Sequence, residues 1–176
     1  MAVTKIAAIF LIVVVLFVVG ISIQLSILNL SFGTESMKTS VQMLFSAISL
    51  VPYNLGELQV AIAISGLLSI LATISCSLFI SSKCRTSLTA LLISMVICFM
   101  PIILYSIAGN SLFSYLLPSS GIGLTNSMLY QLTGLNFINI VGMSVWSPYI
   151  ISVVSLVELI LFSILAIRSY CKHQAI

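Results

Sequence analysis

The chain has 176 residues, of which 61% are hydrophobic and only 5% are charged. Soluble domains carry about 25% charged residues, and six basic and three acidic side chains cannot cover a water-soluble globule of this length. The composition therefore excludes a soluble enzyme and indicates an integral membrane protein whose apolar surface faces lipid or other helices. The net charge of +3 comes from single basic residues beside apolar runs, without the basic patch that a nucleic-acid partner requires.

Four stretches of mainly apolar residues are long enough to cross a bilayer as α-helices. The first stretch is too long for the apolar part of a signal peptide, so we expect it to be an uncleaved spanning helix. The sequence predicts an all-α fold, a polytopic membrane helix bundle in which residues 1–176 form a single transmembrane domain. The four predicted spans are residues 6–28, 59–80, 88–108 and 149–167.

The basic residues predict the orientation of the bundle, because Lys and Arg are enriched in short cytoplasmic loops. With the N-terminus inside, Lys38 is the only basic residue outside the cell. Aromatic rings favour the membrane interface, and this orientation places four of them near the outer one. They are Tyr53, Tyr105, Trp146 and Tyr149. Both signals predict that the N- and C-termini are cytoplasmic.

The segment between the first and second spans predicts a short amphipathic helix. Residues 36–51 place their apolar side chains at helical spacing, on one face of such a helix. These side chains are Met37, Val41, Leu44, Ile48 and Val51. The helix is too short and too polar to span, so we expect it to lie at the outer interface.

The segment 109–147, before the last span, carries no charge but contains Pro118 and several glycines and asparagines. Irregular backbone at membrane depth is tolerated where protein buries it, so we expect re-entrant or interfacial pieces. One piece would be a helix with an apolar face formed by Met128, Leu132, Leu135 and Ile138. A fifth span over residues 124–143 is the competing interpretation, which is disfavoured by Asn126, Gln131, Asn136 and Asn139.

Small side chains recur every four residues along the second span. They are Ala61, Ser65, Ser69, Thr73 and Ser77. A stripe of this kind lets another helix approach closely, so we interpret it as a helix-packing face, either within the chain or against a second chain. In the third span, Pro101 leaves the carbonyl of Ile97 without its helical partner and is expected to kink the helix.

Glu158 is the only acid inside a predicted span, and Ser152 and Ser155 lie on the same side of that helix. An ionised carboxylate inside a bilayer is costly, so we expect Glu158 to face protein or a water-filled cavity. Two roles are open. The carboxyl group could act on a substrate or proton path, or it could be a neutral group that fixes helix packing through hydrogen bonds.

Catalytic and ligand-binding patterns are missing from the sequence. Its one histidine, His173, lies in the predicted cytoplasmic tail, no second acid in a span could partner Glu158, and no phosphate-binding loop occurs. The four cysteines have neither the spacing of a zinc site nor that of a C-x-x-C pair. They are Cys76, Cys84, Cys98 and Cys171. We therefore expect no enzymatic activity, no catalytic residue, no cofactor and no metal, and any ATP hydrolysis would occur in a partner subunit.

Three stretches resemble one known family. They are residues 78–94 leading into Cys98-Phe-Met-Pro101, the uncharged outer segment before the last span, and Trp146-Ser-Pro-Tyr149 with the closing residues 166–174. Their order is similar to the C-terminal part of ABC transporter permeases of the ABC-2 type, found in bacterial multidrug and antimicrobial-peptide exporters. The chain resembles the last four of the six spans of that family.

The resemblance implies a permease component of an ABC exporter in the bacterial plasma membrane, which forms part of the substrate translocation path. It also implies an ABC ATPase subunit as a partner, together with a second membrane subunit or a homodimer within the lipid bilayer. The alternative is a small non-transporting membrane protein that binds a partner or gives immunity to a membrane-active peptide.

Overall fold

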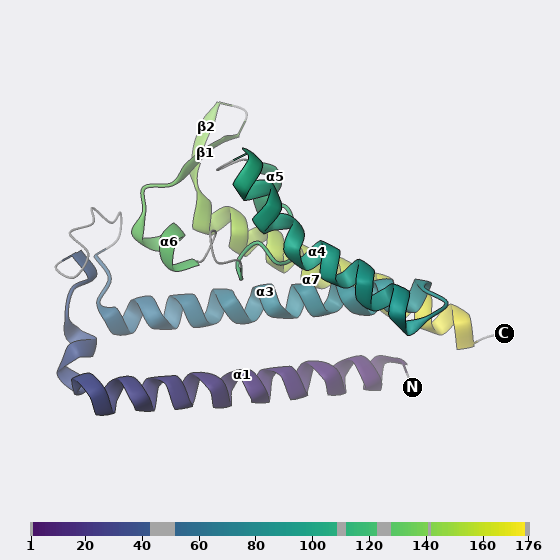
Figure 1. Ribbon diagram of the computed structural model, residues 1–176, viewed down its shortest axis with the longest axis horizontal. Coiled ribbons are helices and arrows are strands. Elements are labelled where there is room, and N and C mark those ends of the chain that lie inside the picture. The colour runs from purple at the N-terminus through teal and green to yellow at the C-terminus, as the bar shows by residue number, and fades with distance from the viewer. Residues whose placement is uncertain (1, 43–51, 109–111, 123–127, 141, 175–176) are drawn as a thin grey trace.

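The computed structural model describes residues 2–42, 52–108, 112–122, 128–140 and 142–174 (Figure 1). Four of its helices are long and apolar enough to cross a membrane. They are α1 (Ala2–Phe32), α3 (Leu55–Lys83), α4 (Ser87–Ala108) and α7 (Ser147–Gln174). The predicted all-α polytopic bundle is confirmed. All four helices extend beyond the predicted apolar stretches, α4 by a single residue, because a helix satisfies its own backbone groups as it leaves the hydrocarbon region.

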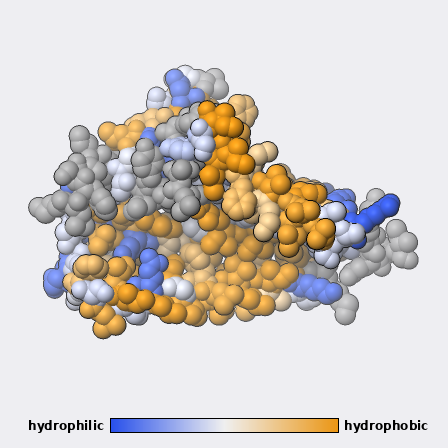
Figure 2. Space-filling model, viewed as in Figure 1, coloured by the Kyte–Doolittle hydropathy of each residue, from blue (hydrophilic) through white to orange (hydrophobic). Residues whose placement is uncertain are grey.

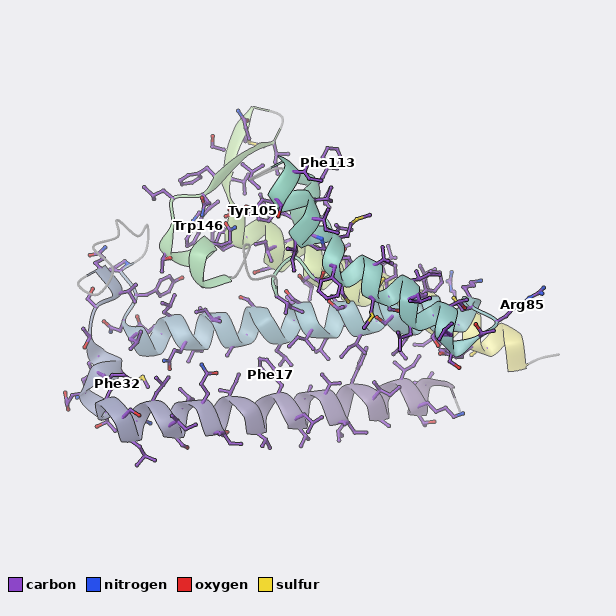
Figure 3. The ribbon with its side chains drawn as sticks, in the orientation of Figure 1. Phe17, Phe32, Arg85, Tyr105, Phe113 and Trp146 are labelled. Carbon is purple, nitrogen blue, oxygen red and sulfur yellow. The ribbon has the colours of Figure 1, made fainter. Side chains whose placement is uncertain are left out.

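The four long helices alternate in direction along the bundle. Helix α1 runs away from the end at which both termini lie, α3 returns to it, α4 runs away again and α7 returns (Figure 1). The short connection from α3 to α4 is at the same end as the termini, and Arg85 in that connection points away from the bundle (Figure 3). Both ends of the chain therefore lie on one side of the bundle.

Helices α3 and α7 form the central pair, and they run parallel to one another. Helices α1 and α4 flank this pair and leave most of their side chains exposed. Leu16 of α1 is 66% exposed and Leu88 of α4 is 70% exposed. Figure 2 shows apolar residues over much of the visible face of these two helices. Such faces are stable only against lipid or a second subunit.

The end of the bundle opposite the termini is covered by short elements. They are α5 (Leu112–Tyr115), α6 (Met128–Thr133), β1 (Phe137–Ile140) and β2 (Met143–Trp146), which we name the cap. The main hydrophobic core lies beneath the cap, where it meets α3 and α7. Its buried residues are Val41, Leu58, Tyr115, Leu132, Ile138, Trp146, Ile150 and Ile151.

The cap differs from the prediction of one helix whose apolar face includes Met128, Leu132, Leu135 and Ile138. Helix α6 ends at Thr133, and Ile138 lies in β1, which pairs antiparallel with β2. In the described part of residues 124–143 no helix is long enough to span, so the competing fifth span does not form. This segment forms strands instead of a helix. Successive side chains of Phe137–Ile140 alternate between exposed and more buried positions, as on a strand. Gly142, between the two strands, has a φ of 84°, which a glycine adopts without strain.

Trp146 lies inside the cap and is only 6% exposed, and its expected place near the outer interface stays a prediction. Its indole N–H donates to the carbonyl of Gly134 at 3.4 Å. The ring packs edge to face on Tyr149, which is exposed. The indole is part of the hydrophobic core beneath the cap.

The predicted helix over residues 36–51 does not form as one piece. A short 3₁₀ helix, η1 (Thr34–Lys38), is followed by Thr39, which is extended, and Ser40 forms an antiparallel bridge with Asn54. The backbone N–H groups of Val41 and Leu55 complete this bridge at 3.0 Å. The bridge ties the segment to the start of α3 and so interrupts the helix. Residues 43–51, with Leu44, Ile48 and Val51, lie outside the described residues.

Candidate functional site

Residues 116–122, which follow α5, do not stay at the end of the bundle but reach its middle. The carbonyl of Pro118 accepts a hydrogen bond from Oγ1 of Thr73 at 2.9 Å. Oγ of Ser119 donates to the carbonyl of Cys98 at 2.8 Å. Thr73 and Cys98 lie in the central turns of α3 and α4, respectively. We name residues 116–122 the re-entrant loop, and it is a piece of the kind that the uncharged segment led us to expect.

Non-helical backbone at this depth needs hydrogen-bond partners, because hydrocarbon offers none. The N–H of Ser120 donates to the carbonyl of Leu117 at 2.9 Å, and that of Ile122 donates to the carbonyl of Ser119 at 3.0 Å. Pro118 has no N–H group that would need an acceptor. Backbone groups of the loop therefore pair with one another, and the Thr73 hydroxyl donates a further hydrogen bond to the Pro118 carbonyl.

Gly121 lets the loop approach α3 closely. A Cβ atom at this position would clash with Oγ of Ser69 and would lie 3.3 Å from Cγ2 of Ile151. Ser69 is itself fully buried, so it has little room to move. A glycine at position 121 is therefore a steric requirement of the loop.

Pro101 lies beneath the loop and is fully buried within α4, which continues as a helix on both sides of it. The Ser119 hydroxyl donates to the carbonyl of Cys98, the residue after Ile97, whose carbonyl loses its partner to the proline. The loop thus docks next to the carbonyl that Pro101 leaves without its helical partner. The kink at Pro101 stays a prediction.

Serine hydroxyls join the central helices α3 and α7. Oγ of Ser69 lies 3.2 Å from Oγ of Ser155, and Oγ of Ser75 lies 3.2 Å from Oγ of Ser163. Ser69, Ser75 and Ser155 are all buried. Small hydroxyl residues let the two backbones approach and hydrogen-bond across the interface, which stabilises helix pairs in lipid.

The residues predicted as one packing face have different surroundings. Ser69 contacts α7 and Thr73 contacts the re-entrant loop. Ala61 packs against the core beneath the cap, Ser77 lines a groove between α3 and α4, and Ser65 is half-buried. A step of four residues turns a helix by about 400°, so the stripe drifts by roughly 40° per step and leaves the interface.

Sequence reasoning missed several residues of this region. The buried face of α3 includes Ser69, Ala72 and Cys76. Their alternating spacing of three and four residues keeps them on one side of a helix, and this pattern could have identified the face. No local pattern marked Ser119, because its acceptor lies on another helix.

Glu158 is half-buried and lies on the side of α7 that faces α3, within electrostatic reach of the Cys76 thiol. Its Oε2 atom is enclosed and has no hydrogen-bond partner in the part of the chain that the structure describes. Ser155 is directed at Ser69, and the Ser152 hydroxyl bonds the carbonyl of Pro148 in its own helix at 2.8 Å. These three predicted residues therefore do not converge on one shared contact, and both roles of Glu158 stay open.

A buried polar network holds the cap to the spans. The Gln131 amide donates to Oη of Tyr115 at 3.0 Å and accepts a hydrogen bond from Oγ of Ser147. All three residues are fully buried. The network joins α6, α5 and the start of α7, so it fixes the position from which the re-entrant loop enters the bundle.

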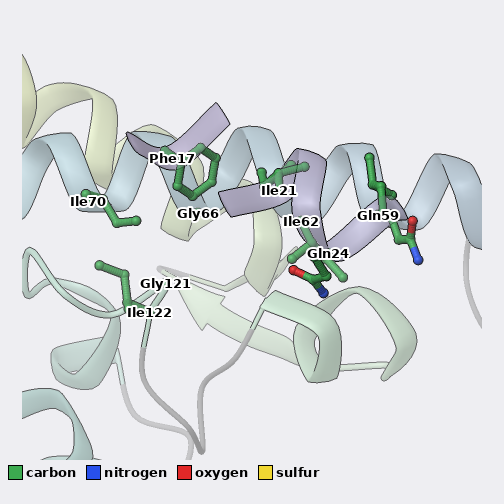
Figure 4. A pocket seen from close by; sticks show the side chains of 11 residues that line it. Phe17, Ile21, Gln24, Gln59, Ile62, Gly66, Ile70, Gly121 and Ile122 are labelled. Carbon is green, nitrogen blue, oxygen red and sulfur yellow. The ribbon is translucent and has the colours of Figure 1, made fainter. Parts of the chain in front are cut away.

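A cavity of about 340 Å³ lies between α1 and α3, beside the re-entrant loop (Figure 4). Phe17 points from α1 toward α3 (Figure 3), and Gly121 and Ile122 of the loop line the same space. Gln24 and Gln59 contribute two amide groups, and no lining residue is charged.

Within the described residues, no three His, Cys, Asp or Glu side chains gather at a place that could hold a metal ion. Comparisons of the chain with protein-family models, with curated proteins and with solved structures give no match. The site is therefore interpreted from its own chemistry, which consists of a re-entrant loop, hydroxyl contacts between helices, an isolated carboxyl group and an uncharged cavity.

Proposed function

We propose that this chain is a membrane-spanning permease component of an ABC exporter. It forms part of the substrate translocation path, and ATP is hydrolysed by a separate ABC ATPase subunit. The observation that carries the proposal is the re-entrant loop, which lies at mid-depth beside an open cavity. Irregular backbone within a bundle of spans is typical of proteins that line a path for a solute.

The exposed flanking helices support a partner in the membrane. Among the residues of α4 whose burial the structure describes, 87–107, only Ala90 and Pro101 are buried, and α1 is exposed along most of its length. A pathway formed by this chain is open on these sides, which a second membrane subunit or a second copy of the chain would close.

The proposal predicts ATP-dependent efflux that needs both subunits. The chain would be co-expressed with candidate bacterial ABC ATPases, co-purified, and reconstituted in vesicles loaded with a fluorescent hydrophobic drug. We expect efflux above background only when ATP, chain and ATPase are all present, and none with an ATPase whose phosphate-binding lysine is replaced. If the chain instead protects cells from a membrane-active peptide with neither an ATPase nor efflux, the alternative of an immunity protein is correct.

We further propose that the chain lies in the bacterial plasma membrane with both termini in the cytoplasm. Introduced thiols at the exposed positions Thr34 and Ser144 should then react with an impermeant maleimide in intact cells. The native Cys84 and Cys171 should react only after permeabilisation, because both lie at the other end of the bundle. Labelling of Cys171 in intact cells would contradict this orientation.

A further inference from the structure

We propose that the cavity between α1 and α3 binds a lipophilic molecule that carries one neutral polar group, of the type found in a long-chain amide. The ligand enters sideways from the bilayer. This inference rests on the proposed function, because it names the substrate class of the exporter.

The cavity has two chemically different ends. Figure 4 shows the amides of Gln24 and Gln59 at one end, and the apolar side chains of Phe17, Ile70 and Ile122 at the other. Gln59 lies near the start of α3 and Ile70 near its middle, so the polar end is the one nearer the cap. A ligand that fits both ends has an apolar tail that points to the middle of the bundle and a polar group near its outer part.

The uncharged lining excludes a charged ligand group at this depth. No acidic or basic side chain lines the cavity, and an ion without a partner is strongly disfavoured in a medium of low polarity. The volume of about 340 Å³ lies at the small end of the range of ligand pockets, which is about 300–1,000 Å³. A small neutral amphiphile matches both properties.

The Gln59 side chain lines the cavity and carries an amide group. Its Oε1 atom is enclosed without a hydrogen-bond partner in the described residues. Rotation of the amide by half a turn exchanges its oxygen and nitrogen, so the group can present either an acceptor or a donor to the cavity. A ligand amide, which both donates and accepts, matches either arrangement.

Entry from the bilayer follows from the weak packing of α1. A Cβ atom at Gly66 would meet only the Phe17 ring within 4 Å, in ordinary van der Waals contact at 3.9 Å. Residues of α1 next to the cavity, such as Leu16 and Ile23, are more than half exposed. On the α1 side, the cavity is therefore separated from lipid by one helix only, and a ligand can enter from the bilayer there.

Photocrosslinking of the purified full chain in phosphatidylcholine nanodiscs tests the proposal. The probe is a long-chain fatty amide that carries a diazirine in its tail and an alkyne for detection. We expect labelling of α1, α3 and the re-entrant loop around the cavity, and competition by the unlabelled amide. Gly66→Leu fills the space and should reduce the competed labelling to background. Gln59→Leu should weaken competition by about five- to tenfold, because one hydrogen bond is lost.

Gly20→Leu is the matched control for Gly66→Leu. Gly20 lies on α1 outside the cavity, with nothing within 4 Å of a Cβ atom there, so this variant should label like the native chain. Labelling that the amide does not compete, or equal labelling of the same residues by a diazirine phosphatidylcholine, would show that only bilayer lipid fills the space and would overturn the proposal. So would normal competed labelling of Gly66→Leu.

The assay uses the chain without an ATPase, so its result is separable from that of the efflux experiment. Competed labelling without any ATP-dependent efflux would keep the binding site and reject the exporter function. Efflux without competed labelling would keep the exporter and reject this cavity as its binding site.

Discussion

Replacing Gly121 with alanine is expected to displace the re-entrant loop and to lower the free energy of unfolding by about 1–3 kcal/mol, the range for overpacking a well-packed site. The new Cβ atom would clash with the Ser69 hydroxyl, which is buried and paired with Ser155. Relief of the clash displaces the Ser69 hydroxyl or the loop, and a displaced loop separates Thr73 from the Pro118 carbonyl. The measurement is the melting temperature of the purified chain in detergent, followed by size-exclusion chromatography.

Gly20→Ala is the control for this prediction, because a Cβ atom at position 20 meets nothing within 4 Å. It should melt at or above the temperature of the native chain, since alanine favours a helix more than glycine does. Adding Ser69→Gly to Gly121→Ala removes the clash and should restore part of the lost stability. A Gly121→Ala variant that melts like the native chain would show that the loop is not held against Ser69.

Replacing Glu158 with leucine is expected to leave assembly intact and to reduce export on the order of tenfold or more, as for a polar group that acts within a membrane. Its Oε2 atom has no hydrogen-bond partner among the described residues, so leucine breaks no such bond there. Exchanging a poorly satisfied buried polar group for an apolar one of similar shape is often neutral or stabilising. Melting temperature and ATP-dependent efflux of the same preparation measure the two effects.

Glu158→Gln separates the roles further, because it keeps the size of the side chain and removes its titratable proton. If the carboxyl acts by charge or by proton transfer, the glutamine variant should assemble and fail to export, like the leucine variant. A leucine variant that does not assemble, together with a glutamine variant that assembles and exports, would assign Glu158 to helix packing. Ser152→Ala is the control on the same helix, since its hydroxyl bonds only Pro148 in the described structure.

The number and place of the spanning helices follow from the sequence by itself. A span needs about 20 apolar residues, and each helix pairs its own backbone, so neither property depends on the rest of the fold. The capacity of residues 55–83 and 147–171 to span can therefore be derived from local composition. The uncharged, glycine-containing segment before α7 could likewise be recognised as irregular and protein-covered, because its polar backbone needs partners inside the bundle.

Side-chain partners across helices depended on the tertiary structure. Thr73 and Pro118 are 45 residues apart, and Ser119 and Cys98 are 21 residues apart, so no local pattern relates them. Ser69 lies in the interface because of how α3 is rotated about its axis relative to α7. A spacing of four residues along the sequence does not specify that rotation.

The cap was also decided by tertiary contacts. Residues 137–146 form a hairpin, and Ile138 and Trp146 are buried against α3 and α7, although the apolar spacing from Met128 to Ile138 also fits a helix. Short apolar segments are compatible with either structure, and the surface onto which they pack selects one of them. The sequence therefore determined what crosses the membrane, because helix pairing and apolar length are local, whereas the re-entrant loop and the cavity beside it arise only where distant segments meet.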